Sequence, residues 1–307
     1  MAYRLTAKRT GVVRSPSKLR RQEERWAYLF ILPQFLGLVC FILGPVIATL
    51  FLSFTSWDLI SSPRWIGLDN YAAQIQAPVF LQSWRNTLYF AVGSVGGSML
   101  LSLALALALN EKLRGVTVYR AIFFLPVVTS AVAVSIVWRW LYNPEFGLLN
   151  VLLGAVGLPP LPWLNSLRWA MPSVIIMSIW HSLGYNMVIF LAGLQGIGEQ
   201  FYEAAKIDGA NAWQRFRYIT LPMLSPTTFF VLVTATIGAM QAFNQVYVMT
   251  NGGPANATRV ILLHIYVLAF RLFNIGEASA VSWVLFLVLF ALTLLNFAIA
   301  RRWVHYE

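Results

Sequence analysis

Six long apolar runs place the strongest constraint on how this chain of 307 residues can fold. The runs are Tyr28–Leu52, Thr87–Leu109, Val118–Trp140, Pro172–Leu194, Pro226–Tyr247 and Ser279–Ala300. Each is long enough to cross a bilayer, whose hydrocarbon core takes about 20 apolar residues in helical form. Lipid offers the backbone no hydrogen-bond partner, so each run is expected to be a helix. The sequence therefore predicts an all-α polytopic membrane protein with six transmembrane helices.

The composition agrees with a protein that is embedded in a membrane. Hydrophobic residues make up 59% of the chain and charged residues only 11%, whereas soluble domains carry about 25% charged residues. A net charge of +11 would suggest nucleic-acid binding in a soluble protein. Here the lysines and arginines lie between the apolar runs, where they set membrane orientation, and no nucleic-acid partner is expected.

The distribution of Lys and Arg predicts which side of the membrane each connection faces. Eight of them lie in residues 1–25, and eight more lie after the second run, after the fourth run and at the C-terminus. The opposite side carries six. The positive-inside rule therefore places both termini in the cytoplasm. The first apolar run is longer than the 7–15 residues of a signal-peptide core, so it is predicted to stay as the first span.

The ionisable residues limit how such a protein could use energy. Coupled protons and ions usually need charged or titratable side chains inside the spans, and only His181 lies well inside one. A P-loop needs Lys followed by Ser or Thr. None of the four lysines is followed by either residue. The energy is thus expected to come from another polypeptide. A secondary, ion-coupled sugar transporter stays open as the alternative, because carbonyl and hydroxyl oxygens can hold sodium.

An enzyme is not expected from this sequence. His181, His264 and His305 fall in different segments and do not have the spacing of metal ligands. Cys40 is the only cysteine, so neither an internal disulfide nor a cysteine-based metal site can form.

The stretch between the fourth and fifth runs predicts a bracket of two short helices on the cytoplasmic side. Gly209 suits the end of a first helix over residues 200–208, because glycine adopts positive φ without steric cost. Asn211 and Gln214 have the spacing of a capping box that opens a second helix. Leu221-Pro222 is expected to end that helix. Ser225 is then predicted to be the N-cap of the fifth span, and Pro226 its first helical residue.

This stretch resembles the EAA loop of ABC-importer permease subunits. The family pattern is Glu-Ala-Ala, three residues, Gly, nine residues and Ile-x-Leu-Pro, and here it stands as "EAAKIDGANAWQRFRYITLP" from Glu203. The segment "TNGGP" at 250–254 resembles the loop after the fifth span in carbohydrate importer permeases, and "LPVVTSAVAVSIVWRWLYNPEFGLLN" at 125–150 resembles their third span. The resemblance covers most of residues 28–300 and is specific to the maltose-transporter-like, binding-protein-dependent branch.

The resemblance implies a type I ABC-importer permease, with a five-helix core and one extra N-terminal helix. It implies four protein partners: a second homologous permease, two ATPase subunits and an extracytoplasmic solute-binding protein. The implied substrate is a sugar, polyol or glycerol phosphate. No cofactor is expected on this chain, since ATP and Mg would be bound by the ATPases. The implied location is the cytoplasmic membrane of a bacterium or archaeon. The coupling residues implied by the motif are Glu203, Ala204, Ala205, Asp208 and Gly209.

The substrate pathway is expected on polar side chains of the fourth and fifth spans, near the middle of the bilayer. The candidates are His181, Ser182, Tyr185, Asn186, Gln241 and Asn244. Aromatic rings can stack on a sugar while amides bind its hydroxyls. Tyr185 stands where maltose-type members of the family have a tyrosine that contacts sugar. Interhelical hydrogen bonds are the other role open to these residues.

Four parts are predicted along the chain. Residues 1–27 form a basic cytoplasmic tail, residues 28–85 the first span and its outer loop, and residues 86–300 the permease core with the coupling loop at 199–222. Residues 301–307 form a short cytoplasmic C-terminus.

Overall fold

The computed structural model describes residues 18–111 and 114–304. Most of the predicted basic tail, together with Lys112 and residues 305–307, lies outside the described residues. The chain divides into two compact units, residues 1–51 and 52–307.

The N-terminal unit is one nearly continuous apolar helix. Helix α1 (Lys18–Leu38) passes through a π-helical turn, η1 (Val39–Leu43), into α2 (Gly44–Leu52). The stretch Gln22–Leu52 is long and apolar enough to cross a membrane. Its large apolar side chains are mostly exposed, as expected for a helix that faces lipid.

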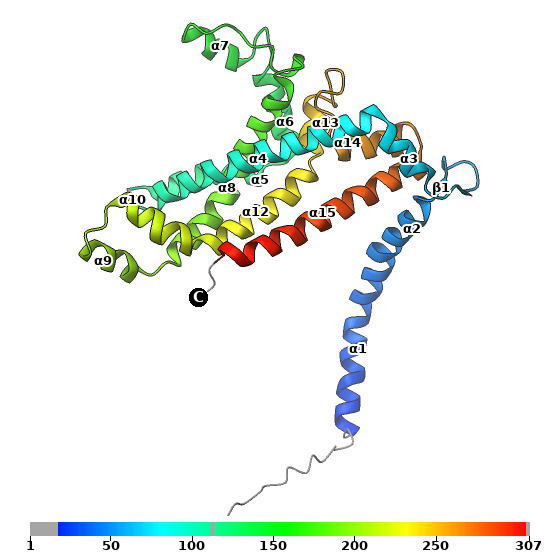
Figure 1. Cartoon of the computed structure of the whole chain (residues 1–307), viewed down its shortest axis with the longest axis horizontal. Coiled ribbons are helices and arrows are strands. Elements are labelled where there is room, and N and C mark those ends of the chain that lie inside the picture. Colours follow the sequence, from blue (N-terminus) through cyan, green and yellow to red (C-terminus); the bar gives the residue numbers. More distant parts are fainter. Residues whose placement is uncertain (1–17, 112–113, 305–307) are drawn as a thin grey trace, which may run out of the picture. The chain divides into compact units, whose positions relative to one another are not determined.

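The second unit is helical apart from one short hairpin of strands. The hairpin pairs β1 (Thr55–Ser56) with β2 (Arg64–Trp65) in antiparallel register. Its helices are α3 (Asp69–Gln76), α4 (Pro78–Asn110), α5 (Val116–Val128), α6 (Ala131–Leu141), α7 (Leu148–Ala155), α8 (Ala170–Gln195), α9 (Glu199–Ile207), α10 (Ala212–Arg215), α11 (Leu221–Met223), α12 (Ser225–Met240), α13 (Asn244–Met249), α14 (Ile261–Tyr266) and α15 (Ile275–Trp303). Three further turns are η2 (Trp163–Asn165), η3 (Phe216–Thr220) and η4 (Val267–Arg271). The long helices α4, α8, α12 and α15 run side by side (Figure 1).

Glycines let α4 and α8 pack closely. A β-carbon at Gly93 or Gly97 would come within 2.9 or 2.4 Å of the side chains of Ile175 and Ile179 on α8. The two glycines are four residues apart and so lie on one face of α4. Small residues at this spacing are common where membrane helices touch, because they allow the backbones to approach. This pair of helices forms the wall on which the site is built.

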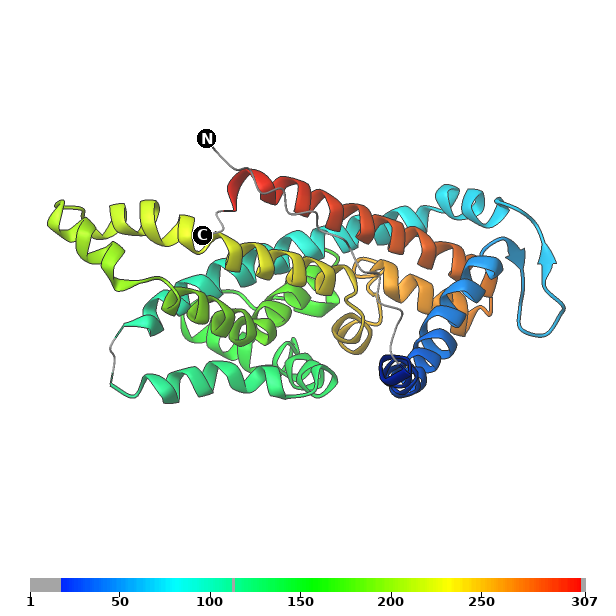
Figure 2. The ribbon, with the colours of Figure 1, turned by 90° about the horizontal axis from the view of Figure 1, so that it is seen from below.

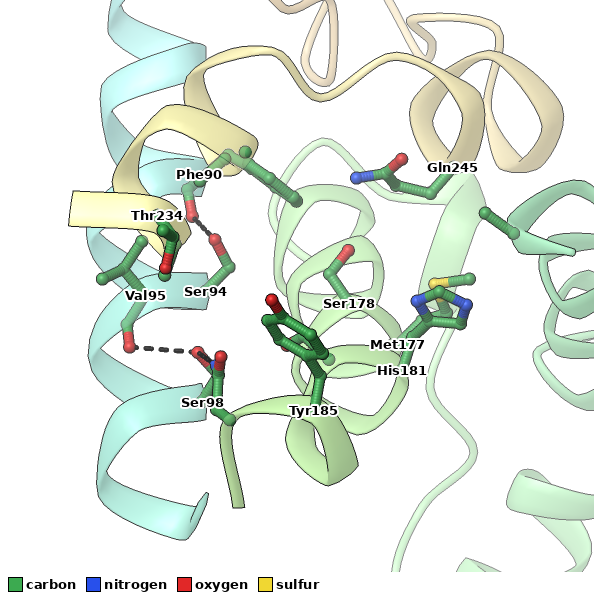
Figure 3. A pocket seen from close by; sticks show the side chains of 16 residues that line it. Phe90, Ser94, Val95, Ser98, Met177, Ser178, His181, Tyr185, Thr234 and Gln245 are labelled. Carbon is green, nitrogen blue, oxygen red and sulfur yellow. Dashed lines mark hydrogen bonds between the residues drawn. The ribbon is translucent and has the colours of Figure 1, made fainter. Parts of the chain in front are cut away.

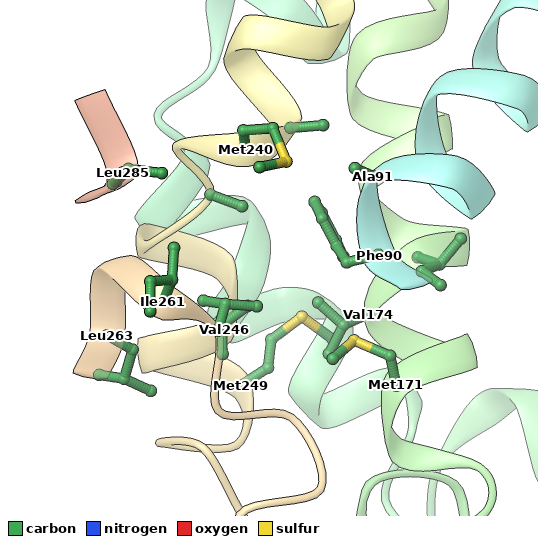
Figure 4. Close-up of a cluster of buried hydrophobic side chains, with 14 of the residues drawn as sticks. Phe90, Ala91, Met171, Val174, Met240, Val246, Met249, Ile261, Leu263 and Leu285 are labelled. Atoms are coloured by element: carbon green, nitrogen blue, oxygen red, sulfur yellow. The ribbon is translucent and has the colours of Figure 1, made fainter. Parts of the chain in front are cut away.

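The larger hydrophobic core joins α4, α8, α12, α13, α14 and α15. Phe90, Val174, Met240 and Val246 are almost fully buried in it, and Figure 4 shows them with their neighbours. A second cluster, around Phe190 and Leu224, lies toward the other end of α8. Because both clusters include α8, that helix is held along its length.

The predicted third span is broken in the structure. Helix α5 ends at Val128, α6 begins at Ala131, and the two meet at an angle of 100°. The Thr129 hydroxyl donates a hydrogen bond to the carbonyl of Pro126 (2.6 Å), and the Thr129 amide donates to the same carbonyl (3.3 Å). Thr129 itself is extended (φ −83°, ψ 147°), so the helix ends at Val128 and a new one starts at Ala131.

The predicted fifth span, Pro226–Tyr247, is also not one helix. Helix α12 ends at Met240, and α13 starts only at Asn244. Leu224 takes the N-cap position predicted for Ser225, so α12 begins one residue early. Within the described residues, four helices are long and apolar enough to cross a membrane. The number rises to as many as six if two bent pairs each count as one span, α5 with α6 (100°) and residues 212–223 with α12 (63°).

The predicted boundary at residues 85 and 86 falls inside α4. This helix starts at Pro78 and continues without interruption to Asn110. Residues 52–85 belong to the same compact unit as the core. The amide of Ile275 at the start of α15 donates to the carbonyl of Trp57 (3.0 Å), which explains part of this attachment.

Candidate functional site

A cavity of about 230 Å³ opens between α4, α6, α8, α12 and α13. Figure 3 shows polar side chains from α4, α8 and α12 pointing into it. The lining residues are Phe90, Ser94, Val95, Ser98, Ala131, Met177, Ser178, His181, Ser182, Tyr185, Asn186, Thr234, Ala235, Gly238, Ala239 and Gln245. None of these residues carries a permanent charge, so the lining suits an uncharged, hydroxyl-rich ligand better than an anion.

The structure brings four of the six predicted pathway residues together. His181, Ser182, Tyr185 and Asn186 all line the cavity from α8, because their spacing repeats about once per helical turn. Gln241 and Asn244 do not line it. They flank the break between α12 and α13, a break that turns Gln245 toward the cavity in their place (Figure 3).

Several lining residues were not singled out from the sequence. Ser94 and Ser98 of α4 donate to carbonyls of their own helix, as do Ser178 and Thr234. Their hydroxyl oxygens remain able to accept hydrogen bonds. Serines inside an apolar run carry no periodic signal of their own, and only the packing of α4 against α8 shows that they face a cavity.

Two side chains in the cavity are well suited to bind a ligand. The side chains of Tyr185 and Gln245 form no hydrogen bond with the described part of the chain. Tyr185 is 47% exposed. An exposed aromatic ring near a free amide is the combination that binds the apolar face and the hydroxyls of a sugar.

His181 links the cavity to the break in the third span. Its Nε2 lies 3.4 Å from the carbonyl oxygen of Thr129, which belongs to the turn between α5 and α6. That carbonyl is freed by the break, and a protonated ring nitrogen at His181 can donate to it. If the bend between α5 and α6 changed, the carbonyl of Thr129 would therefore move relative to His181, which lines the cavity.

The bracket at residues 199–222, for which the sequence predicts a coupling role, folds as two short helices around a glycine. Gly209 has φ of +77°, and Ala210 donates to the carbonyl of Ala205 (2.8 Å), which closes the end of α9. Asn211 and Gln214 form the predicted capping box, with reciprocal bonds of 2.9 and 2.8 Å. The bracket lies at one end of α4, α8 and α12, opposite α3 and the hairpin (Figure 2).

The second helix of the bracket does not end at Leu221-Pro222 as predicted. The backbone stays helical through a π-helical turn, η3, and then through α11 to Met223. Pro222 sits in the first turn of α11, where a missing backbone N–H costs no hydrogen bond. The bracket therefore joins α12 through helical turns instead of a free loop.

The predicted coupling residues are presented on the surface of the bracket. Glu203, Ala204, Asp208 and Gly209 are exposed, and Ala205 is half-buried. Large apolar side chains accompany them. Ile207 is 86% exposed, Trp213 68% and Tyr218 74%. Exposed apolar side chains on a polar, well-capped element are typical of a protein-binding surface.

Four polar side chains form a series of hydrogen bonds at the end away from the bracket, with Gln74 and His264 buried and Arg259 and Glu277 half-buried. Arg259 Nη2 donates to His264 Nδ1 (3.0 Å), His264 Nε2 donates to Gln74 Oε1 (2.9 Å), and Gln74 Nε2 donates to Glu277 Oε2 (2.5 Å). Burial, and then the charge of Arg259, lower the pKa of His264 to about 4. This series of hydrogen bonds therefore holds His264 in its neutral form and links α3, α14 and α15.

The "TNGGP" segment forms a compact loop beside the hydrogen bonds that run from Arg259 to Glu277. Thr258 is fully buried and donates to the carbonyl of Gly253 (2.8 Å). Arg271 donates to Asn251 Oδ1 (2.9 Å), and its guanidinium lies about 6 Å from the rings of Tyr247 and Tyr266. The loop is thus a fixed structure that presents polar and aromatic groups at the end away from the bracket.

Comparison with known proteins identifies a family whose members share this fold. Residues 98–304 match the family described as "Binding-protein-dependent transport system inner membrane component". The chain belongs to this family. The match begins in the middle of α4 and includes most of the cavity lining, the bracket and the "TNGGP" loop of this permease.

Two relatives and one solved structure show which branch of the family the permease resembles. The lactose transport system permease protein LacF of Rhizobium radiobacter is 38% identical over 94% of this chain and 98% of its own length. The trehalose/maltose transport system permease protein MalF of Thermococcus litoralis is 36% identical, over 93% and 97%. A chain from the crystal structure of a bacterial alginate ABC transporter, in complex with an alginate pentasaccharide-bound periplasmic protein, superimposes with a TM-score of 0.82 and 25% identity, over 93% and 98%.

These similarities confirm the resemblance found in the sequence. The chain is an ABC-importer permease subunit of the carbohydrate type, with the type I permease fold, and it is a multi-pass membrane protein. Permease subunits of this family are not enzymes, and ATP hydrolysis belongs to a partner ATPase.

Proposed function

We propose that this permease forms one half of the translocation pathway of an ATP-driven importer for a neutral sugar or a related polyol. It would be driven by two ATPase subunits through the bracket at 199–222. A second homologous permease would complete the pathway, and an extracytoplasmic binding protein would deliver the solute. ATP and Mg would be bound by the ATPases, and this chain would carry no cofactor.

One structural relationship carries this proposal. The bracket is the direct connection between α8 and α12, and these two helices carry His181, Tyr185 and Thr234 on the cavity wall. A rigid displacement of the bracket would therefore act on two walls of the cavity at once. Gly209 and the capping box hold the bracket in one shape, as a part that transmits motion requires.

The exposed surface of the bracket supports ATPase docking. Glu203 can pair with an arginine of the ATPase, and a hydrogen bond between charged groups contributes about 1.5–3 kcal/mol. Ala204 and Gly209 leave room for close approach. Asp208 adds a second carboxylate near the turn, and Ile207 and Trp213 supply apolar contact area.

The cavity supports the class of substrate and the need for a second permease. Hydroxyl and amide groups without a charged side chain favour a neutral sugar over a sugar acid or a glycerol phosphate. Its volume of about 230 Å³ is below the roughly 300–1,000 Å³ of pockets that enclose a ligand. A facing subunit would supply the remaining walls.

The predicted topology is part of the proposal. Six spans with both termini in the cytoplasm require two bent pairs to count as one crossing each: α5 with α6, and α12 with the helical turns that precede it. This arrangement puts the bracket in the cytoplasm, where ATPases lie, and the "TNGGP" loop outside, where a binding protein arrives. The membrane would be the cytoplasmic membrane of a bacterium or archaeon.

Uptake by reconstituted vesicles tests the proposal. The complex, purified through a tag on this chain and loaded with its binding protein and radiolabelled neutral oligosaccharides, should accumulate solute when ATP reaches the ATPases and no ion gradient is imposed. The chain reconstituted alone should give no uptake. Accumulation by the chain alone, driven by a sodium or proton gradient, would show a secondary transporter instead.

A further inference from the structure

Helix α9 of the bracket is attached to the rest of the permease mainly through one side chain. Of its nine residues, Glu199–Ile207, only Tyr202 and Ala205 are half-buried, and the others are exposed. Among the described residues, the Tyr202 hydroxyl is the only side-chain group of α9 that hydrogen-bonds outside the helix, and its partner is the hydroxyl of Thr220 (3.0 Å). Because α9 lies at the far end of the bracket (Figure 1), this bond is its main side-chain link to the spans.

Thr220 is well placed to anchor that link. It is only 5% exposed and is the last residue of η3, directly before the turn α11 that leads into α12. Tyr202 packs against the second hydrophobic cluster, as do Ile219 and Met223, which lie near Thr220 in the sequence. The Thr220 hydroxyl also points to the carbonyl of Arg215 (3.5 Å). Since a hydroxyl has one proton to donate, Tyr202 is the donor whenever Thr220 donates to Arg215.

Both ends of α9 adjoin glycines. Gly198 precedes the helix, and Gly209, with φ of +77°, follows it after Asp208. Glycine restricts rotation of the backbone less than any other residue, so a force on α9 tilts the helix about these two points unless a bond across the bracket opposes the tilt. The bond from Tyr202 to Thr220 joins the middle of α9 to η3 and therefore opposes it.

We propose that Tyr202 is a positioning residue that makes α9 move as one body with α12. This proposal rests on the proposed function, which supplies the ATPase that moves α9. Glu203 directly follows Tyr202, so a force on Glu203 enters α9 next to the bond that carries it on. Thr220 passes the force through α11 to α12, which carries Thr234 on the cavity wall. Without the bond the ATPase still docks and hydrolyses ATP, but part of each movement tilts α9 instead of displacing α12.

Removal of either hydroxyl from the complete transporter in vesicles tests the proposal. Tyr202→Phe and Thr220→Val should each lower solute uptake per ATP hydrolysed about two- to tenfold, the weight of one neutral hydrogen bond. The double variant should be no worse than the poorer single variant, because both changes remove the same bond. Thr220→Ser keeps the hydroxyl and should couple like wild type. Two matched controls should leave coupling unchanged: Tyr119→Phe at an exposed position of α5, and Thr228→Val, whose hydroxyl bonds to the carbonyl of Leu224 one turn back.

Two further measurements separate coupling from docking and folding. Recovery of the ATPase with the tagged chain should be the same in Tyr202→Phe as in wild type. Amide hydrogen exchange of the permease should become about two- to tenfold faster in α9, where the bond is lost, and stay unchanged in α8.

The outcomes also separate this inference from the proposed function. Unchanged coupling or unchanged exchange in Tyr202→Phe, additive losses in the double variant, or equal losses in Thr220→Ser and Thr220→Val would overturn the inference. Reduced recovery of the ATPase would overturn it as well, because Tyr202 would then act in docking. If wild type takes up solute without ATP, the proposed function fails; if wild type couples ATP to uptake and Tyr202→Phe does so equally well, only the inference fails.

Discussion

Gly184 of α8 lies directly against the backbone of Phe123 in α5. A β-carbon at Gly184 would overlap the carbonyl oxygen of Phe123. Next to this contact, Ser102 of α4 donates to the carbonyl of Leu183 (3.1 Å). Three helices thus meet at one tight crossing, immediately beside Tyr185 and Asn186 of the cavity wall. The position of that wall depends on how closely α5 approaches α8.

We predict that Gly184→Ala destabilises the permease by separating α5 from α8. Forced overpacking of a core typically costs 1–3 kcal/mol. The thermal unfolding temperature of the complex in detergent should fall measurably. The control is Gly96→Ala at an exposed position of α4, where a β-carbon meets nothing within 4 Å and alanine favours the helix by about 1 kcal/mol. Equal unfolding temperatures for both variants would contradict the tight crossing.

Glu203→Ala should uncouple ATP hydrolysis from transport. Loss of a hydrogen bond between charged groups, about 1.5–3 kcal/mol, corresponds to roughly tenfold or more in docking affinity. Uptake per ATP hydrolysed should fall by about that factor, while the complex still inserts into the membrane. Glu199→Ala provides the matched control, since Glu199 is an exposed acidic residue of the same helix outside the EAA pattern. Equal coupling ratios in the two variants would argue against Glu203.

Gly209→Pro should affect coupling more strongly than Glu203→Ala. Gly209 has φ of +77°, which proline, fixed near −65°, cannot adopt. Proline also removes the amide that donates to the carbonyl of Lys206. The turn between α9 and α10 would open, and uptake should be abolished. Wild-type uptake by a correctly inserted Gly209→Pro variant would mean that the shape of the bracket does not matter.

Substitutions in the cavity should change the transport KM. Gln245→Leu removes an amide that faces the cavity, and a hydrogen bond is worth about 0.5–1.5 kcal/mol, so KM should rise about two- to tenfold. Tyr185→Ala should raise it further, because the ring is lost as well. Gln241→Leu changes the same residue type four positions away, outside the cavity lining, and should leave KM unchanged. A larger effect at Gln241 than at Gln245 would place the pathway elsewhere.

Acidification should destabilise the end of the permease that holds His264. The folded protein lowers the pKa of this histidine from 6.5 to about 4, so folding opposes its protonation. The stabilisation is complete above pH 6.5 and is lost as the pH falls toward 4. The groups facing the ring are Arg259 and Gln74, with Glu277 behind Gln74. The unfolding temperature should drop over this range, and His264→Gln should flatten the drop; an unchanged drop in the variant would assign it to other groups.

Much of the bracket could be predicted because its signals are local. Gly209 at a helix end and the spacing of Asn211 and Gln214 determine their own backbone geometry, whatever the rest of the chain does. The break at Thr129 was missed because the run is apolar on both sides of it, and the turn is marked only by the hydroxyl and amide of Thr129, which both donate to the carbonyl of Pro126. A sum of hydropathy over the run does not detect such a bond.

The cavity was only half predictable for a related reason. The residues on α8 were found from helical spacing within one predicted span. Gln245 was passed over for Gln241 and Asn244, because its direction is set by the break after Met240. The series of hydrogen bonds from Arg259 to Glu277 joins residues that are far apart in sequence, Gln74 and His264 among them. Only tertiary packing brings them together.

Side-specific labelling of Ile207 tests the central claim most directly. Ile207→Cys, in a Cys40→Ala background, places the single thiol at an 86% exposed position of the bracket. A membrane-impermeant maleimide should label it in inside-out vesicles stripped of ATPase, should label it far less when the ATPase is bound, and should not reach it in intact cells. Labelling of intact cells, or equal labelling with and without the ATPase, would contradict a cytoplasmic bracket on which the ATPase docks.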